Sequence, residues 1–326
     1  MAAPPVKLSA IESILLPPEI TTPIFDRAVE ESAIMRLARK VPLSMTAQTA
    51  IPVPMDLPVA GWVDEGGPKP TGTAGMGVKT MQGKKVACLV PVSQEVANSN
   101  AAGLYTQIQQ DLPKALARAF DLAAIHGKTP TGGPGPFADF LTETPYTVQL
   151  GTAPQNKGGI WADLVAAMKL VVDGDDDPSH PSEGYDMTGW AGDPRLRPDL
   201  LLATDVNGRP IFLDTTTPGV GAVGSGSLVG LPLSYSRGIS GKVIRQSGAR
   251  DTGLRLIAGD FGQCAYGVGM DITLKISTEA GYVDADGTWH SAFQENLVLL
   301  LAEAHFGFVI GNPKAFATLT SKGGGS

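Results

Sequence analysis

The strongest helical signal in the chain is a stripe of apolar residues between positions 104 and 127. Its members recur every four residues and therefore share one face of a helix: Leu104, Ile108, Leu112, Leu116 and Phe120. Gly127 follows, and glycine commonly stands just past a helix end. Pro113 interrupts the run, so we expect either a kink or the start of a second helical piece there.

Two further segments carry a helical pattern. Residues 21–40 begin with Thr22 before Pro23, have acidic residues in the first turns and end on basic residues, which is typical of a helix. Residues 158–174 repeat apolar positions at helical spacing and predict a second amphipathic helix.

Two strand-like runs flank a segment rich in glycine and proline. Residues 49–63 and 78–93 are apolar and the second is rich in β-branched residues, so we expect one long hairpin. Lys69 lies near its far end, between Pro68 and Pro70, which restrict the backbone on both sides. The pattern predicts an exposed, stiff excursion that presents a lysine amine.

Further strands are expected in the second half of the sequence, at 197–205, 208–214, 254–261, 272–277 and 296–311. The segment 296–311 is the longest of these and reads as a strand, although its leucine, alanine and glutamate content leaves a helix open. Residues 129–136 and 173–184 have the composition of loops. The strand–turn–strand pattern around Lys69, followed by the strongest helical stripe, predicts an α+β fold.

The composition fits a folded protein with many turns. The 326 residues are 43% hydrophobic and 17% charged, and they include 40 glycines and 26 prolines. Cys88 and Cys264 both lie in apolar stretches, which favours free buried thiols. No apolar run is long enough for a membrane span, and a net charge of −7 gives no basic patch with which to bind nucleic acid by neutralising phosphate.

The sequence contains no convincing small-molecule site. Residues 219–224 (GVGAVG) match a dinucleotide-binding pattern but lack the strand before it and the helix within it. The four histidines are scattered, and the acidic cluster at 173–177 lacks the order of a calcium loop. We therefore expect no cofactor and no metal. An ordinary soluble enzyme of two α/β domains stays open as an alternative, but the sequence shows no set of catalytic residues for it.

The order of the motifs resembles the major capsid proteins of tailed bacteriophages, which have the Hong Kong 97 fold. The hairpin carries W-x-x-E-G-x-x-K-P at 62–70, and L-V-P-V-S-x-E follows at 89–95. Next come the helix ending ALARAFDLAAIHG and, near the end, F-x-x-N-L at 293–297 before a strand containing Glu303. The similarity covers nearly the whole sequence and is weakest across 140–250.

The resemblance implies a division of the protein into the elements of that fold. They are an N-terminal arm with a helix (1–45), an extended loop, the E-loop, with flanking strands (46–95), a peripheral (P) domain with a spine helix (96–150), an axial (A) domain (151–255), P-domain strands (256–310), and a return to the A domain with a flexible tail (311–326).

The resemblance also implies assembly partners and a cellular location. Copies of the protein would form hexamers and pentamers of an icosahedral shell enclosing double-stranded DNA without sequence-specific contacts, in a virion assembled in the cytoplasm of a host bacterium. Because the sequence begins almost at the arm, we expect a separate scaffolding protein or a processed N-terminus. A portal and a decoration protein are further implied partners, and an encapsulin-like cellular compartment with the same fold is the alternative.

In some family members an E-loop lysine forms an isopeptide bond with a P-domain asparagine of another subunit, assisted by a glutamate. Lys69, Asn296 and Glu303 match these three residues. Desolvation should raise the pKa of Glu303, as suits a base. The ordinary alternatives are a surface salt bridge for Lys69, an edge cap for Asn296, and a basic partner across an interface for Glu303.

The seven-residue spacing adds a condition. If 296–303 is one regular strand, Asn296 and Glu303 lie on opposite faces, and a third subunit must supply the base. If the segment is a helix, the two share a face and can act within one subunit.

Overall fold

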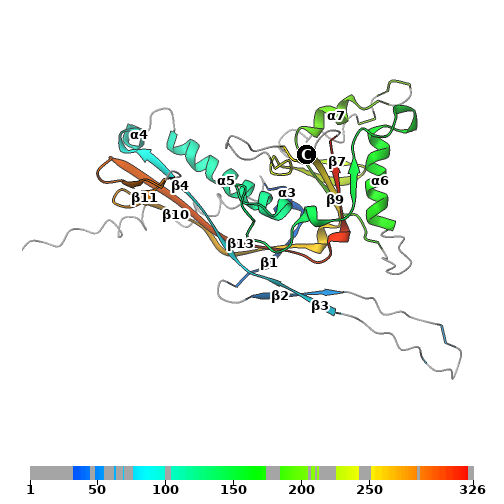
Figure 1. Ribbon diagram of the computed structural model, residues 1–326, viewed down its shortest axis with the longest axis horizontal. Coiled ribbons are helices and arrows are strands. Elements are labelled where there is room, and N and C mark those ends of the chain that lie inside the picture. Colours follow the sequence, from blue (N-terminus) through cyan, green and yellow to red (C-terminus); the bar gives the residue numbers. More distant parts are fainter. Residues whose placement is uncertain are drawn as a thin grey trace, which may run out of the picture.

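The computed structural model describes most of the protein. The described residues are 32–44, 48–54, 62–63, 69, 76–99, 104–173, 184–204, 207–209, 211–212, 225–241, 251–284 and 287–321. They form an elongated lobe with a long sheet, a second lobe with a six-stranded sheet, and a two-stranded ribbon that projects from the first lobe (Figure 1).

The elongated lobe is built on a four-stranded sheet. In sheet order its strands are β1 (Arg39–Pro42), β10 (Cys264–Ser277), β13 (Leu297–Ile310) and β4 (Lys84–Ser93). β1 runs parallel to β10, and the other neighbours are antiparallel. The strand predicted at 296–311 is therefore confirmed, and the strand predicted at 272–277 is the end of the longer β10.

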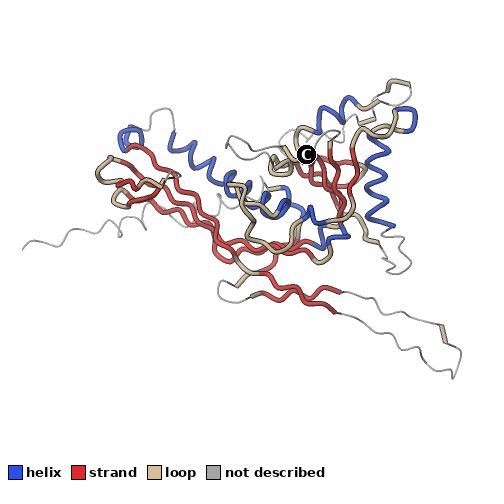
Figure 2. The backbone as a smooth tube through the Cα atoms, in the orientation of Figure 1, coloured by secondary structure: helices blue, strands red, loops and turns tan. Residues whose placement is uncertain are grey.

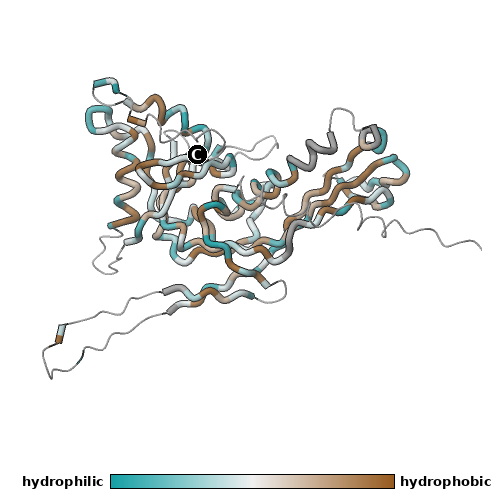
Figure 3. Tube along the Cα trace, turned by 180° about the vertical axis from the view of Figure 1, so that it is seen from behind, coloured by the Kyte–Doolittle hydropathy of each residue, from teal (hydrophilic) through white to brown (hydrophobic). Residues whose placement is uncertain are grey.

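The long helix α5 (Leu104–His126) covers one face of this sheet, as Figure 2 shows. Phe120 packs edge to face against Phe306 and Phe308, with ring centroids 5.6 and 6.0 Å apart. The helix predicted at 104–127 is confirmed, and it continues through Pro113 as a single element. Hydrophobic positions follow the long strands beneath it (Figure 3), because their inner side chains face the helix.

Short elements complete this lobe. The helix α4 (Gln94–Ser99) follows β4, and the strands β11 (Gly281–Val283) and β12 (Trp289–Ser291) form a hairpin between β10 and β13. Cys264 is a buried free thiol, as predicted, whereas Cys88 is free but only half-buried.

The second lobe contains the six-stranded sheet and the helices α6 (Ile160–Asp173) and α7 (Leu196–Leu202). In sheet order its strands are β5 (Thr147–Gln149), β14 (Phe316–Thr320), β9 (Leu254–Gly259), β6 (Gly189–Gly192), β8 (Leu231–Tyr235) and β7 (Ser225–Leu228). The predictions of a helix at 158–174 and a strand at 254–261 are confirmed. Single 3₁₀ turns lie at Leu141–Glu143, Gln155–Lys157, Phe261–Gln263 and Pro313–Ala315.

The ribbon pairs β2 (Thr49–Pro54) with β3 (Met76–Met81) in antiparallel register. The predicted hairpin was too long at its second end, because the run 78–93 contains two strands. β4 leaves the ribbon after the break at residues 82–83 and joins the long sheet. The side chains of β4 alternate between more and less buried positions, and α5 can cover every second one of them. The described part of the exposed ribbon has no helix that could cover these side chains.

Two predicted strands and one predicted helix are also corrected. The strand predicted at 197–205 is mostly the helix α7, because Leu196 and Leu200, four residues apart, are both buried. Within 208–214, the described residues are not in a strand.

In the predicted helix 21–40, the described part is the short helix α3 (Ala33–Leu37), and Arg39 and Lys40 belong to β1. Residues 1–31 and the glycine motif at 219–224 lie outside the described residues.

A buried carboxylate connects the two lobes. Asp121 of α5 is fully buried and accepts hydrogen bonds from Ser32 Oγ (2.6 Å), the Ala33 amide (3.2 Å) and Ser236 Oγ, just after β8 (2.5 Å). Ser32 also caps α3 by accepting from the Met35 amide. Burial raises the pKa of Asp121 to about 6, against the opposing effect of these bonds.

Candidate functional site

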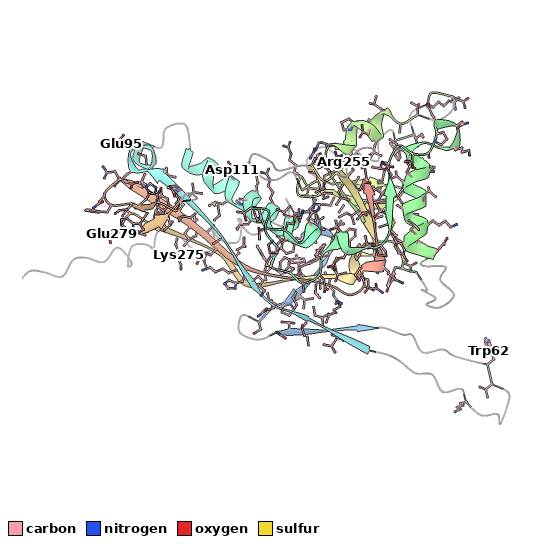
Figure 4. The ribbon with its side chains drawn as sticks, viewed as in Figure 1. Trp62, Glu95, Asp111, Arg255, Lys275 and Glu279 are labelled. Atoms are coloured by element: carbon pink, nitrogen blue, oxygen red, sulfur yellow. The ribbon has the colours of Figure 1, made fainter. Side chains whose placement is uncertain are left out.

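Lys69 lies in the excursion between β2 and β3, and its side chain is exposed. Trp62, in the same excursion, is fully exposed and lies far from the labelled residues Glu95, Lys275 and Glu279 at the other end of the molecule (Figure 4). The lysine is thus presented to solvent, as the proline pattern predicts.

Asn296 lies at that opposite end, in the turn before β13. Its backbone is left-handed, with φ of 50°, a conformation that asparagine tolerates better than most residues. Its carbonyl accepts a 2.8 Å bond from the Gln94 amide, and the next amide, of Leu297, donates 2.8 Å to Ala292 O. The side chain of Asn296 is exposed. The turn therefore presents an amide on a backbone that is fixed on both sides.

A histidine cluster lies beside this turn. His290 Nδ1 lies 3.0 and 3.1 Å from the two carboxylate oxygens of Glu295, and Nε2 lies 3.1 Å from Asp284 Oδ2. The imidazole stacks on Tyr282, with ring centroids 5.1 Å apart. Hydrogen bonds to Asp284 and Glu295 raise the pKa of His290 above its usual value.

The sequence pattern did not reveal this cluster, because no histidine stands at metal-ligand spacing from another histidine or a cysteine, the spacing by which a functional histidine is most easily recognised. The available signal was a pair of carboxylates, six residues before and five after His290, around a short hairpin.

Glu303 lies on β13, on the face of the sheet away from α5. Its carboxylate is 2.5 Å from Lys85 Nζ and 3.6 Å from Lys275 Nζ. Both lysines are two residues from the strand partners of Glu303, Ala87 and Thr273, and therefore share its face. Within one subunit, two lysines therefore already pair with Glu303.

This environment corrects the pKa expectation. The Lys85 hydrogen bond, followed by the charges of Lys85 and Lys275, lowers the pKa of Glu303, whereas desolvation alone would raise it. In the isolated subunit Glu303 is therefore a stabilised carboxylate and a weak base.

One subunit holds the three predicted residues apart. The segment from Leu297 to Ile310 is a strand, so the helical arrangement in which Asn296 and Glu303 share a face is ruled out. Glu303 lies six steps along the strand from Leu297, about 20 Å along the sheet. A lysine in contact with Asn296 cannot reach Glu303 of the same subunit.

The described residues offer neither a membrane span nor a metal site. No helix among them is both long and apolar enough to cross a membrane. In the same part of the protein, no three histidine, cysteine or carboxylate side chains gather as metal ligands would.

Comparison with known proteins decides the family. The model of the phage capsid family matches residues 12–321. The chain belongs to the phage capsid family. It is a major capsid protein, a subunit of the virion shell, and the match supports this role over the cellular compartment and the enzyme that the sequence alone leaves open.

Relatives and solved structures agree with this assignment. The protein is 30% identical over 315 residues to the probable major capsid protein of Mycobacterium phage L5, covering 94% of this protein and 89% of the relative. The corresponding protein of Mycobacterium phage D29 is 28% identical over 318 residues, covering 95% and 92%. A structure from Gordonia phage Cozz is similar with a TM-score of 0.70 at 25% identity, covering 90% of this capsid protein and 87% of that structure.

Proposed function

We propose that the capsid protein assembles as hexamers and pentamers into an icosahedral shell around double-stranded DNA. The Hong Kong 97 arrangement provides the parts: an arm at 1–45, an E-loop with its flanking strands at 46–95, a P domain at 96–150 and 256–310, and an A domain at 151–255 with the return at 311–326. The projecting ribbon, α5 on its long sheet, and β14 in the six-stranded sheet support this division.

The shell would form in the cytoplasm of the host bacterium with a separate scaffolding protein, and would bind a portal and a decoration protein. The acidic net charge of −7 supports enclosure of DNA without neutralisation of its phosphates by this protein.

The shell is reinforced by a covalent bond between Lys69 of one subunit and Asn296 of a neighbour. The unprotonated Lys69 Nζ attacks Cγ of Asn296, a base takes a proton from the attacking nitrogen and passes it to Nδ2, and the amide nitrogen leaves as ammonia. An isopeptide bond forms between Nζ and Cγ, the original bond between Cγ and Nδ2 breaks, and no oxidant or cofactor is needed.

The observation that carries this proposal is the separation of the two residues. Trp62, in the same excursion as Lys69, and Glu95, next to the Gln94 whose amide bonds to Asn296 O, lie at opposite ends of the subunit in Figure 4, so a bond between Lys69 and Asn296 joins two copies. A contact of this head-to-tail kind closes into rings when it repeats around an axis. Rings of five and six are the units that the proposed shell needs.

Glu303 of a third copy is the proposed base. Within its own subunit the pKa of Glu303 is lowered by Lys85, which opposes this role. Burial of the carboxylate at the contact, with displacement of Lys85 by the incoming lysine, would raise that pKa and provide a proton acceptor.

Electron microscopy and denaturing electrophoresis test the two parts separately. Expression together with the scaffolding protein should give closed shells, and monomers or dimers alone under these assembly conditions contradict the assembly proposal. Boiled shells should give a ladder of crosslinked subunits that disappears in Lys69→Arg and persists in the matched control Lys79→Arg on the same ribbon, where Lys79 pairs with Asp139. A single monomer band from wild-type shells contradicts the crosslink alone.

A further inference from the structure

The contacts of His290 are complete only when its imidazole carries two protons. Nδ1 faces both oxygens of Glu295 and Nε2 faces Asp284, all at 3.0–3.1 Å. A neutral imidazole has a single N–H and can donate to only one of these carboxylates, and its other nitrogen would then face an oxygen without a hydrogen between them. The imidazolium donates to both.

The cluster joins three separate segments of the lobe. Asp284 follows β11 and is tied to the hairpin by the bond from the Thr288 amide to its Oδ1, at 2.8 Å. His290 lies in β12, and Glu295 is in the turn before β13. The ring of His290 stacks on Tyr282, which fixes the plane of the imidazole. The backbone amide of Glu295 donates 3.1 Å to Ser291 O, and its carboxylate is held to the hairpin through His290.

Glu295 directly precedes Asn296. On the other side, the Asn296 carbonyl is held by Gln94 and the following amide by Ala292. The left-handed backbone of Asn296 is unfavourable for an L-residue and needs such restraints at both ends. The side-chain restraint on the preceding residue is the contact with His290.

We propose that His290 is a positioning residue for the crosslink: its imidazolium holds Glu295 and thereby the turn that presents Asn296, so that loss of its proton loosens the turn. This inference rests on the proposed Lys69–Asn296 bond. Among the described residues, the ionisable groups in contact with the ring are Asp284, Glu295 and the stacked Tyr282. A network of two carboxylates around one cation is more restraining than an isolated surface pair.

The inference predicts a particular pH profile. A primary amine attacks an amide carbon only in its unprotonated form, so crosslinking should accelerate as pH rises. Deprotonation of His290 acts in the opposite direction, because the turn loses one of its restraints. Together they give a rate that passes through a maximum. Without His290 the rate should only rise.

Crosslinking rates in assembled shells test this between about pH 6 and 9. We expect His290→Gln to slow the reaction near neutral pH by on the order of 10-fold, because the attacked atom is less well placed. The maximum should also disappear. His290→Arg, which keeps a cation able to donate to both carboxylates, should restore the rate without the decline at high pH. Glu279→Gln is the control, since it removes a carboxylate of the same lobe that is not a partner of His290.

The outcomes separate this inference from the crosslink itself. If wild-type shells crosslink and His290→Gln has the same rate and profile, the inference is wrong and the crosslink stands. If wild-type shells form no bond at any pH, the crosslink and this role of His290 both fail.

Hydrogen exchange of the Leu297 amide, which donates to Ala292 O, then measures the turn directly. Protection relative to the intrinsic rate should fall with rising pH in wild type and be uniformly low in His290→Gln. Equal protection in the two proteins overturns the positioning itself. Shell yield by electron microscopy shows whether each variant has folded.

Discussion

Ser236 donates a 2.5 Å hydrogen bond from Oγ to Oδ2 of Asp121, and this bond joins the six-stranded sheet to the long helix α5. Asp121 has the environment of a buried carboxylate surrounded by hydroxyls and an amide, with no basic group among the partners in the described residues. The junction between the lobes is therefore sensitive to the protonation of one group.

We expect Asp121 to make subunit stability depend on pH. Its pKa is raised from 3.8 to about 6, so in this interval the folded state binds more protons than the unfolded state. The free energy of unfolding should therefore fall by about 3 kcal/mol in total as the pH rises from about 4 to about 6. Above about pH 6 this group should cause no further change. Denaturant unfolding of unassembled subunits measures the slope. Asp121→Asn should flatten it, and an unchanged slope in the variant contradicts the assignment.

The pKa of Glu303 should depend on Lys85. Because the Lys85 hydrogen bond is the largest cause of the lowered pKa, Lys85→Met should raise it, and carboxyl NMR titration of Glu303 would detect the change. If Glu303 is the base, the same variant should crosslink faster. Lys84→Met is the matched control, since Lys84 Nζ donates to Gln82. A titration curve identical in wild type and Lys85→Met would show that the ion pair does not control this group.

The aromatic contacts of α5 should be a main source of stability in the elongated lobe. Phe120 is 3% exposed and its ring packs against Phe306 and Phe308. Phe120→Ala should lower the free energy of unfolding by about 3–5 kcal/mol. Phe293→Ala, at a ring that is 75% exposed, should change it by less than about 0.5 kcal/mol. Denaturant midpoints of unassembled subunits make the comparison, and similar losses in both variants would contradict it.

The backbone of Asn296 allows the crosslink to be removed without disturbing the turn. Asn296→Gly accepts φ of 50° freely but has no side-chain amide, so shells should form and remain uncrosslinked on denaturing gels. Asn296→Ala lacks the same amide but is strained, by about 1 kcal/mol or more. We therefore expect a lower unfolding midpoint for the alanine variant than for the glycine variant. Crosslinked ladders in either variant would exclude Asn296 as the acceptor.

The sequence by itself determined the elements whose burial follows a local period. The stripe from Leu104 to Phe120 was sufficient for α5, and the apolar run after Asn296 marked a long buried element, although its composition left both strand and helix open. Pro68 and Pro70 likewise predicted the exposure of Lys69 from backbone restriction alone. Such patterns work because a helix or strand repeats one face toward the interior, so that neighbours in sequence report on each other.

The tertiary structure alone decided what depends on residues distant in the sequence. β4 left the ribbon because α5 could cover one of its faces, and Leu200 became helical because its turn packs into the second lobe. The pKa of Glu303 is lowered because strand pairing places Lys85 and Lys275 beside it. In sequence, Lys85 is more than 200 residues from Glu303 and Lys275 about 30 residues. Burial and charge act through space, and the register that sets those distances is fixed only when the sheets form.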